Sequence, residues 1–260
     1  MKIAIVVGKE NQKAEDLSAK IKEYISSKGH EVVDYVEGAQ IAIVLGGDGT
    51  LIHTACSNVE PGVPFVGINA GTLGFLTAEE AGDWQKAVEK LIGGDYVISE
   101  RMILEASIGE VSHRAVNEIV IKGMYRVVNL EIHVNGQKFL TSVGDGVIIA
   151  TPTGSTAYSL SAGGPIVDPD VDSILVTPIN TVGLPTPSVV LSPEDKLEIK
   201  LVYGDDVSLI IDGQEHVGIS QSQSVRVESG KKRIKLVYFD KHHFLQALNA
   251  KFGLANRIVG

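Results

Sequence analysis

The chain has 260 residues, 44% of them hydrophobic and 21% charged, and its 32 acidic and 23 basic side chains give a net charge of −9. This composition excludes a disordered chain, and no apolar run reaches the roughly 18 residues that a membrane-spanning helix needs. The acidic balance disfavours nucleic acid and anionic membranes as partners, because lysine and arginine dominate binding to both. The single cysteine, Cys56, excludes an intramolecular disulfide and a zinc site built from cysteines. With no cleavable apolar leader visible, we expect a cytoplasmic protein.

The first part of the chain alternates predicted strands and helices. β-branched apolar runs predict buried strands, and helical spacing of apolar residues predicts amphipathic helices. This order predicts a parallel sheet with helices on its faces, in an α/β domain over residues 1–95. The expected strands are residues 3–7, 31–36, 41–45 and 64–69, and the expected helices are residues 14–25 and 78–91.

Beyond residue 95 the chain consists of short β-rich segments. Turn signals such as Asn135-Gly136 and Asp212-Gly213 separate them, at spacings typical of a sandwich or layered β domain, which we place over residues 96–239. Helices are expected at residues 155–162 and 241–248, and we expect residues 240–260 to pack back on the first domain.

Glycines follow the predicted strand at residues 41–45, in the sequence GGDGT at residues 46–50. Glycine lets a phosphate or ribose approach backbone N–H groups, and a helix N-terminus behind the turn adds partial positive charge. Asp48 would repel a phosphate, so it indicates a metal ion or a hydroxyl whose proton it accepts. The plain alternative is a turn with Asp48 as the helix N-cap. We expect a nucleotide or phosphoryl-transfer site, with a second glycine turn at residues 71–74 facing the same crevice.

Two further segments carry polar side chains. GDG…TPTGSTAYSLSAGGP at residues 144–165 runs from a strand into a hydroxyl-rich turn and a short helix, which predicts a polar cradle; capping and turn formation are the alternative. Asn117 and Glu118 interrupt an apolar strand expected at residues 115–121. Neighbours in a strand point to opposite faces, so one of the two needs a partner.

These three motifs, in this order, resemble those of the NAD kinase family, and the resemblance covers essentially the whole chain. It implies an N-terminal α/β domain, a mainly β C-terminal domain, and NAD bound between them. It also implies transfer of a phosphoryl group to the 2′-hydroxyl of the adenosine ribose. Family members use a divalent metal, for which we expect Mg²⁺, take ATP or polyphosphate as donor, and assemble as homodimers or homotetramers.

The same resemblance assigns the site residues. Asp48 is the expected general base and lies with Gly49 at the ribose, while Asn117 and Glu118 bind the adenine and nicotinamide-ribose ends. Asp145 contacts a ribose, Gln214 is a further ligand contact, and His53 is either a ligand contact or a structural helix residue. The expected phosphate and donor loop is Gly46, Gly47, Gly49 and Thr50, and the expected adenosine and phosphate contacts are Thr156, Ala157, Tyr158, Ser159, Leu160 and Ser161.

One position departs from the family pattern. Many relatives have a basic residue where this chain has Val143, so a cation near the ligand must come from Arg126, Lys122 or a neighbouring subunit. The adjacent residues His242 and His243 have no third metal ligand beside them in the sequence, and we expect them at the surface.

Two other functions remain open from the sequence. One is a kinase of a lipid or sugar hydroxyl, which shares the GGDGT chemistry. The sequence gives this alternative no support from an exposed apolar entry segment or a basic face for a membrane. The other is a sensor that holds NAD or NADP without turnover. A sensor would need to have lost the base, and Asp48 is present.

Overall fold

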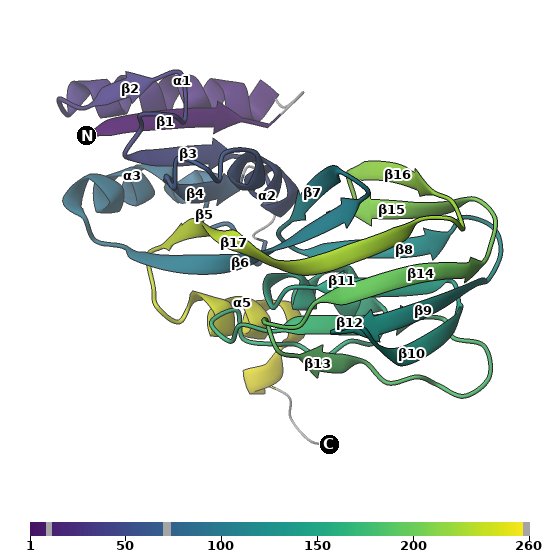
Figure 1. Ribbon diagram of the computed structural model, residues 1–260. Helices are drawn as coiled ribbons and strands as arrows, with labels where there is room; N and C mark the ends of the chain where they lie inside the picture. The colour runs from purple at the N-terminus through teal and green to yellow at the C-terminus, as the bar shows by residue number, and fades with distance from the viewer. Residues whose placement is uncertain (9–11, 70–73, 257–260) are drawn as a thin grey trace. The chain divides into compact units, whose positions relative to one another are not determined.

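The computed structural model describes residues 1–8, 12–69 and 74–256. The chain forms two compact units: the first comprises Met1–Glu100 and the chain from Arg233 onward, and the second comprises Arg101–Lys232. The two longest strands, β6 (Val97–Ile108) and β17 (Ser224–Tyr238), have residues in both units (Figure 1). None of the helices in the described ranges combines the length and the apolar character needed to cross a membrane.

The first unit is built on a parallel sheet. Its strand order is β2, β1, β3, β4 and then the C-terminal part of β17, and short β5 pairs with the end of β4 (Figure 1). The strands are β1 (Lys2–Val7), β2 (Glu31–Val33), β3 (Ile41–Leu45), β4 (Pro64–Asn69) and β5 (Glu79–Glu80). Every residue of β3 is buried, as expected for a central parallel strand.

Helices cover both faces of this sheet. Apolar residues of α1 (Gln12–Ser27) and α3 (Trp84–Gly93) share one core with alternate residues of β1, β3 and β4. On the opposite face, α2 (Asp48–Ser57) packs on β3 and β4, and α5 (His243–Phe252) also belongs to this unit.

The predicted helix at residues 78–91 was wrong in its start. Glu79 and Glu80 pair with the end of β4, and a 3-10 turn at Ala81–Asp83 precedes α3, which begins only at Trp84. Backbone pairing with a neighbouring strand and the poor helix propensity of Gly82 together outweigh the helical spacing.

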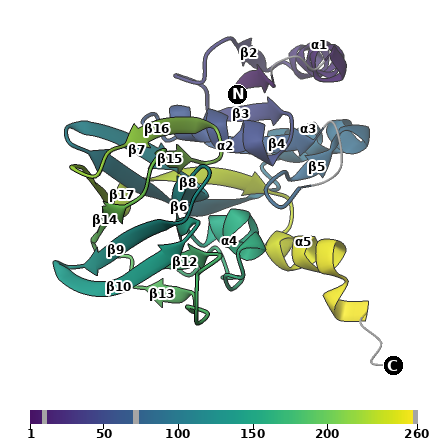
Figure 2. The ribbon, with the colours of Figure 1, turned by 90° about the vertical axis from the view of Figure 1, so that its right-hand side faces the viewer.

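The second unit consists of two sheets, which confirms the expected mainly β architecture (Figure 2). One has the order β10, β9, β14, β17, β6, β7, and the other is antiparallel with the order β13, β12, β11, β8, β15, β16. The strands not yet bounded are β7 (Val111–Ala115), β8 (Glu118–Gly123), β9 (Val128–Val134), β10 (Gln137–Gly144), β11 (Gly146–Ala150), β12 (Ile174–Ile179), β13 (Val189–Leu191), β14 (Leu197–Tyr203), β15 (Val207–Ile211) and β16 (Glu215–Ile219).

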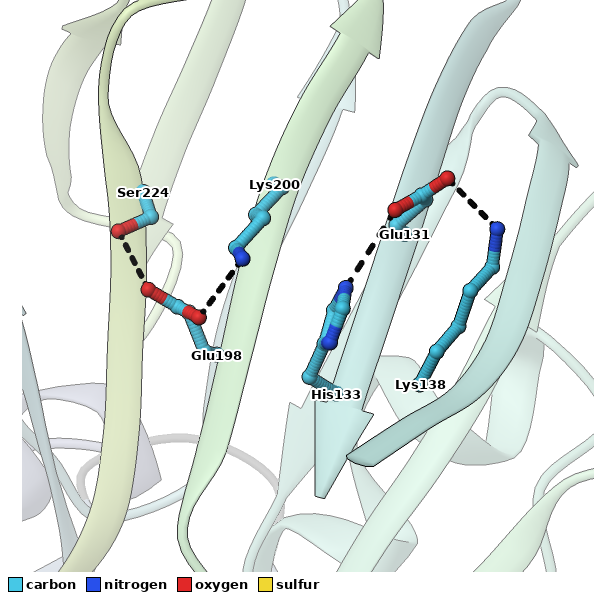
Figure 3. A network of polar contacts seen from close by, with 6 residues as sticks. All are labelled: Glu131, His133, Lys138, Glu198, Lys200 and Ser224. Carbon is cyan, nitrogen blue, oxygen red and sulfur yellow. Dashed lines mark hydrogen bonds and ion pairs between the residues drawn. The ribbon is translucent and has the colours of Figure 1, made fainter. Parts of the chain in front are cut away.

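Side chains alternate along the first of these sheets. Residues of β9, β14 and β17 that point inward form the main core with the second sheet, whereas the outward residues are charged and paired (Figure 3). Lys138 Nζ lies 2.6 Å from Glu131 and Lys200 Nζ lies 3.2 Å from Glu198. These hydrogen bonds from lysine are the main cause that lowers the pKa of each glutamate.

The central strands β8, β11 and β12 of the second sheet are buried on both faces. One face contributes to the main core, and residues on the other face of β8, β11 and β12 form a smaller core with Ala162 and Val167. The segment that follows β11 therefore covers this face, and its short helix α4 (Tyr158–Ser161) packs against β11 (Figure 2). This double burial explains why the central strands read as continuous apolar runs.

Gly67 in β4 provides a test of this packing. A Cβ at this position would lie 2.9 Å from Leu51 Cδ2 and 3.1 Å from Thr77 Cα, so Gly67→Ala should destabilise the protein by about 1–3 kcal/mol. Gly93→Ala in α3 is the matched control, because its Cβ meets nothing within 4 Å and alanine favours a helix. Urea unfolding of both variants checks this, and equal free energies of unfolding would contradict it.

Candidate active site

The GGDGT loop connects β3 to α2. Gly47 is the N-cap of α2 and Asp48 is its first residue, so the alternative of Asp48 as the N-cap was wrong. A Cβ on Gly46 would lie 2.7 Å from Thr50 Oγ1, whereas one on Gly47 would meet nothing within 4 Å. Gly46 is therefore required by the close packing of the first helical turn. The second predicted glycine turn lies at residues 71–74, of which 71–73 fall outside the described residues.

The carboxylate of Asp48 binds three consecutive backbone N–H groups. Oδ2 accepts from Phe75 at 2.7 Å, and Oδ1 accepts from Leu76 and Thr77 at 3.1 Å each. Gly74 allows this approach, since a Cβ there would overlap the carboxylate. A carboxylate has about four acceptor sites, so one remains for a further donor such as a hydroxyl. The loop thus presents an acceptor of fixed orientation at the N-terminus of a helix.

A second carboxylate makes the same arrangement in the other unit. The predicted strand at residues 115–121 is broken between β7 and β8, and Asp212 accepts from the N–H groups of Val116, Asn117 and Glu118 at 2.9, 2.8 and 3.1 Å. Asp212 has φ +47° in the turn between β15 and β16. In the sequence, Asp212-Gly213 indicates only a turn, and nothing local predicts these contacts of the Asp212 carboxylate.

Glu118 lies beside this break and is buried, with 6% of its surface exposed. Burial and, to a smaller extent, the negative charge of Asp212 raise the pKa of its carboxyl, the backbone N–H of Tyr158 lowers it, and the net result is a pKa of about 7. Its Oε2 atom has no hydrogen-bond partner among the described residues. Glu118 therefore offers a buried polar atom to a ligand.

The segment after β11 is tied to the same break. Thr151 Oγ1 donates to the carbonyl oxygen of Val116 at 2.6 Å, and Thr151 N donates to that of Asn117 at 2.9 Å. Gly154 lies directly against the Asn117 backbone, where any Cβ would clash. These contacts bring Asn117, Glu118 and the start of α4 together, as the motif spacing alone did not predict.

Hydroxyl groups in this segment divide into two sets. Ser159 is buried and bonded to Thr177 Oγ1 at 3.0 Å, and Thr156 Oγ1 donates to the carbonyl oxygen of Thr153 at 3.2 Å. Their hydroxyls hold the local fold. Tyr158, 37% exposed, and Ser161 present their side chains to solvent, while Ala157 and Leu160 are half-buried.

The other predicted site residues are distributed over both units. Asp145 is exposed beside β11 and accepts from Asn180 Nδ2 at 2.8 Å, and Lys122 lies opposite the neighbouring Gly146 in the sheet. Gln214 is exposed in the turn between β15 and β16. In the first unit, His53 is exposed on α2.

Comparisons with known proteins agree with these motifs. Residues 3–96 match the family model described as the ATP-NAD kinase N-terminal domain, and residues 116–239 match the ATP-NAD kinase C-terminal domain. The NAD kinase of Treponema denticola is 33% identical over 97% of this chain and 96% of the relative. That of Geobacter metallireducens is 40% identical over 84% and 80%, and that of Clostridium botulinum is 39% identical over 92% and 87%.

Solved structures share the fold. A yeast NADH kinase complexed with NADH superposes with a TM-score of 0.86 at 24% identity, covering 99% of this chain and 89% of the other. An NAD kinase from Archaeoglobus fulgidus in complex with ATP gives 0.81 at 24% identity, with coverages of 96% and 98%. The matched family models cover most of the sequence, and the chain therefore belongs to the ATP-NAD kinase family of phosphotransferases.

Proposed function

We propose that this chain transfers a phosphoryl group from ATP to the 2′-hydroxyl of the adenosine ribose of NAD, with Asp48 as general base. The observation that carries the proposal is the Asp48 carboxylate, which three N–H groups hold in place with one acceptor site to spare. A ribose hydroxyl is a poor nucleophile at neutral pH, and a fixed carboxylate can orient it and take its proton as the P–O bond forms. Family membership favours NAD over a lipid or sugar as acceptor.

The second unit supplies the residues that we propose bind NAD. Asn117 and Glu118 are held by Asp212 and offer an amide and a buried carboxyl oxygen, groups that pair with the edges of a base or with ribose hydroxyls. The exposed Tyr158 ring offers an apolar face beside them. The hydroxyl of Ser159 is bonded to Thr177 inside the protein, so we propose that Ser159 contacts the ligand through its backbone.

A divalent cation fits this chemistry. The described residues contain no group of three or more His, Cys, Asp or Glu side chains that would form a dedicated metal site. Mg²⁺ commonly binds through substrate phosphates and water, with only one or two protein carboxylates. We therefore propose Mg²⁺ that enters with ATP, whose charge it neutralises against a protein of net charge −9.

We also propose that the protein is cytoplasmic and acts as a homodimer or homotetramer. Val143, Val182 and Leu184 expose 38%, 62% and 88% of their surface, and the N–H of Val182 bonds to the carbonyl oxygen of Val143 at 2.8 Å. Exposed apolar residues next to each other are typical of contact surfaces. A neighbouring copy of the chain is then one source of the basic side chain that many relatives have at the position of Val143.

Metal removal is the first test. Purified protein with NAD, ATP and Mg²⁺ should form NADP, and excess EDTA should abolish this, because the negative charges that meet in the site repel one another strongly unless neutralised. Restoring Mg²⁺ above the chelator concentration is the control. NADP formation that persists in EDTA would refute the metal requirement. A protein that binds NAD but forms no NADP under any of these conditions would instead support the alternative of a non-catalytic NAD sensor.

Asp48→Asn tests the general base. The amide cannot take a proton, so kcat should fall by at least about a hundredfold. Its NH₂ group also faces backbone donors, which costs about 1–3 kcal/mol of stability at most. Asp34→Asn, at an exposed position, makes the same change of charge and should leave kcat unaltered. Steady-state kinetics with calorimetric NAD titration check both variants, and a kcat within threefold of wild type would end the assignment.

Glu118→Gln tests the buried carboxyl. With its folded pKa near 7 and an unfolded value of 4.5, the folded state retains a proton that the unfolded state releases, so stability is lost as pH rises from about 4.5 through 7. The amide removes this loss. As the pH rises from 5 to 8, the free energy of unfolding of the variant should therefore increase by about 2 kcal/mol relative to that of wild type, as measured by denaturant unfolding.

Glu131→Gln serves as the control for this pH dependence. Lys138 lowers the pKa of Glu131, so that residue stabilises the fold above its unfolded pKa and loses this effect as the pH falls. Replacing Glu131 by Gln should change the dependence of stability on pH only slightly, and in the direction opposite to that of Glu118→Gln. Parallel profiles for wild type and Glu118→Gln would contradict the raised pKa of Glu118.

A further inference from the structure

The C-terminal helix α5 contacts the turn that binds Asp48. Nε2 of His243 lies 3.2 Å from the carbonyl oxygen of Phe75, and because this oxygen only accepts, Nε2 carries the proton of the hydrogen bond. The N–H of the same Phe75 donates to Asp48 at 2.7 Å. Both backbone groups of Phe75 are therefore bound, one by the helix and the other by the carboxylate.

His243 is itself held by its neighbours. Its ring stacks on that of Tyr238, with centroids 4.2 Å apart and an angle of 20°, and Tyr238 is buried in β17. At the other end of α5, the ring of Phe252 lies 6.1 Å from that of Phe75. The helix thus contacts Phe75 from its first residue and from its last.

These contacts correct the expectation that both adjacent histidines lie at the surface. His242 is exposed, but His243 is half-buried. No metal site explains it, since no group of three or more His, Cys, Asp or Glu side chains in the described part of the chain could hold an ion. Its position between Tyr238 and Phe75 requires another explanation.

We propose that His243 is a positioning residue for Asp48 and acts through the Phe75 peptide; this rests on the proposed function of Asp48. The hydrogen bond fixes the plane of the peptide that follows Phe75. That peptide carries the N–H of Leu76, which donates to Asp48 Oδ1 at 3.1 Å. Loss of the bond frees the turn, and the carboxylate no longer meets its hydroxyl in the same orientation. NAD binding groups of the second unit are untouched.

Two replacements of similar size separate the hydrogen bond from packing. His243→Gln keeps an N–H donor and His243→Met does not, and both residues favour a helix. The Met variant should lose about tenfold in kcat with KM for NAD within about threefold, because displacement of a catalytic group lowers the rate more than binding. The Gln variant should stay within about threefold of wild type in both.

Hydrogen exchange supplies a readout that does not require activity. The amides of Phe75, Leu76 and Thr77 should exchange faster in His243→Met than in wild type or His243→Gln. His242→Ala, at the exposed neighbour, is the control and should change neither exchange nor kcat. A wild type that forms no NADP would refute the proposed function, and the exchange rates would still decide whether His243 fixes the turn.

The proposal is overturned if His243→Met matches wild type in kcat and exchange, or if His243→Gln is as impaired as His243→Met. Should the Met variant fail to fold, Phe252→Leu removes the ring contact with Phe75 from the other end of α5. Phe252→Leu should also lower kcat and speed the exchange of the amides of residues 75–77. If both stay at the wild-type values, the proposal is overturned.

Discussion

A carboxylate that binds three consecutive backbone N–H groups occurs in each of the two units, and the candidate site residues of each unit depend on it. Asp48 binds those of residues 75–77, and Asp212 binds those of residues 116–118. Residues 116–118 lie at the break between β7 and β8, and residues 75–77 lie in the connection between β4 and β5. Without the carboxylate these partly buried donors would lack partners, which costs about 1–3 kcal/mol for each unsatisfied group. One side chain thereby defines a turn that no local sequence preference would form.

Both arrangements require a glycine that lets another group approach. Gly74 leaves room for the Asp48 carboxylate, and Gly154 lets the segment after β11 lie against the backbone of Asn117. Close approach explains the glycine at both positions, because a Cβ on either would overlap neighbouring atoms. Gly74 and Gly154 are therefore part of the packing that aims the polar groups.

The sequence predicted those features that follow from local pattern. Buried β3, the glycine turn and α2 follow from an apolar run, missing Cβ atoms and a helix start, and the hairpin at Asn135-Gly136 follows from its turn residues. The break at residues 116–117 depends on Asp212, almost a hundred residues away, and local periodicity contains no trace of it. The inward position of Ser159 likewise depends on Thr177, and the half-buried position of His243 on Tyr238 and Phe75.

The two carboxyl groups expected to meet NAD have different surroundings and so different chemistry. Asp48 is surrounded by donors, which suits an acceptor that must keep its orientation while it takes a proton. Glu118 receives one backbone N–H, lies near the charge of Asp212, and has a pKa near 7. At neutral pH it is protonated in a large fraction of molecules, and a protonated carboxyl donates as well as accepts. Its unpartnered Oε2 can therefore pair with either a donor or an acceptor on the ligand, a versatility that suits recognition.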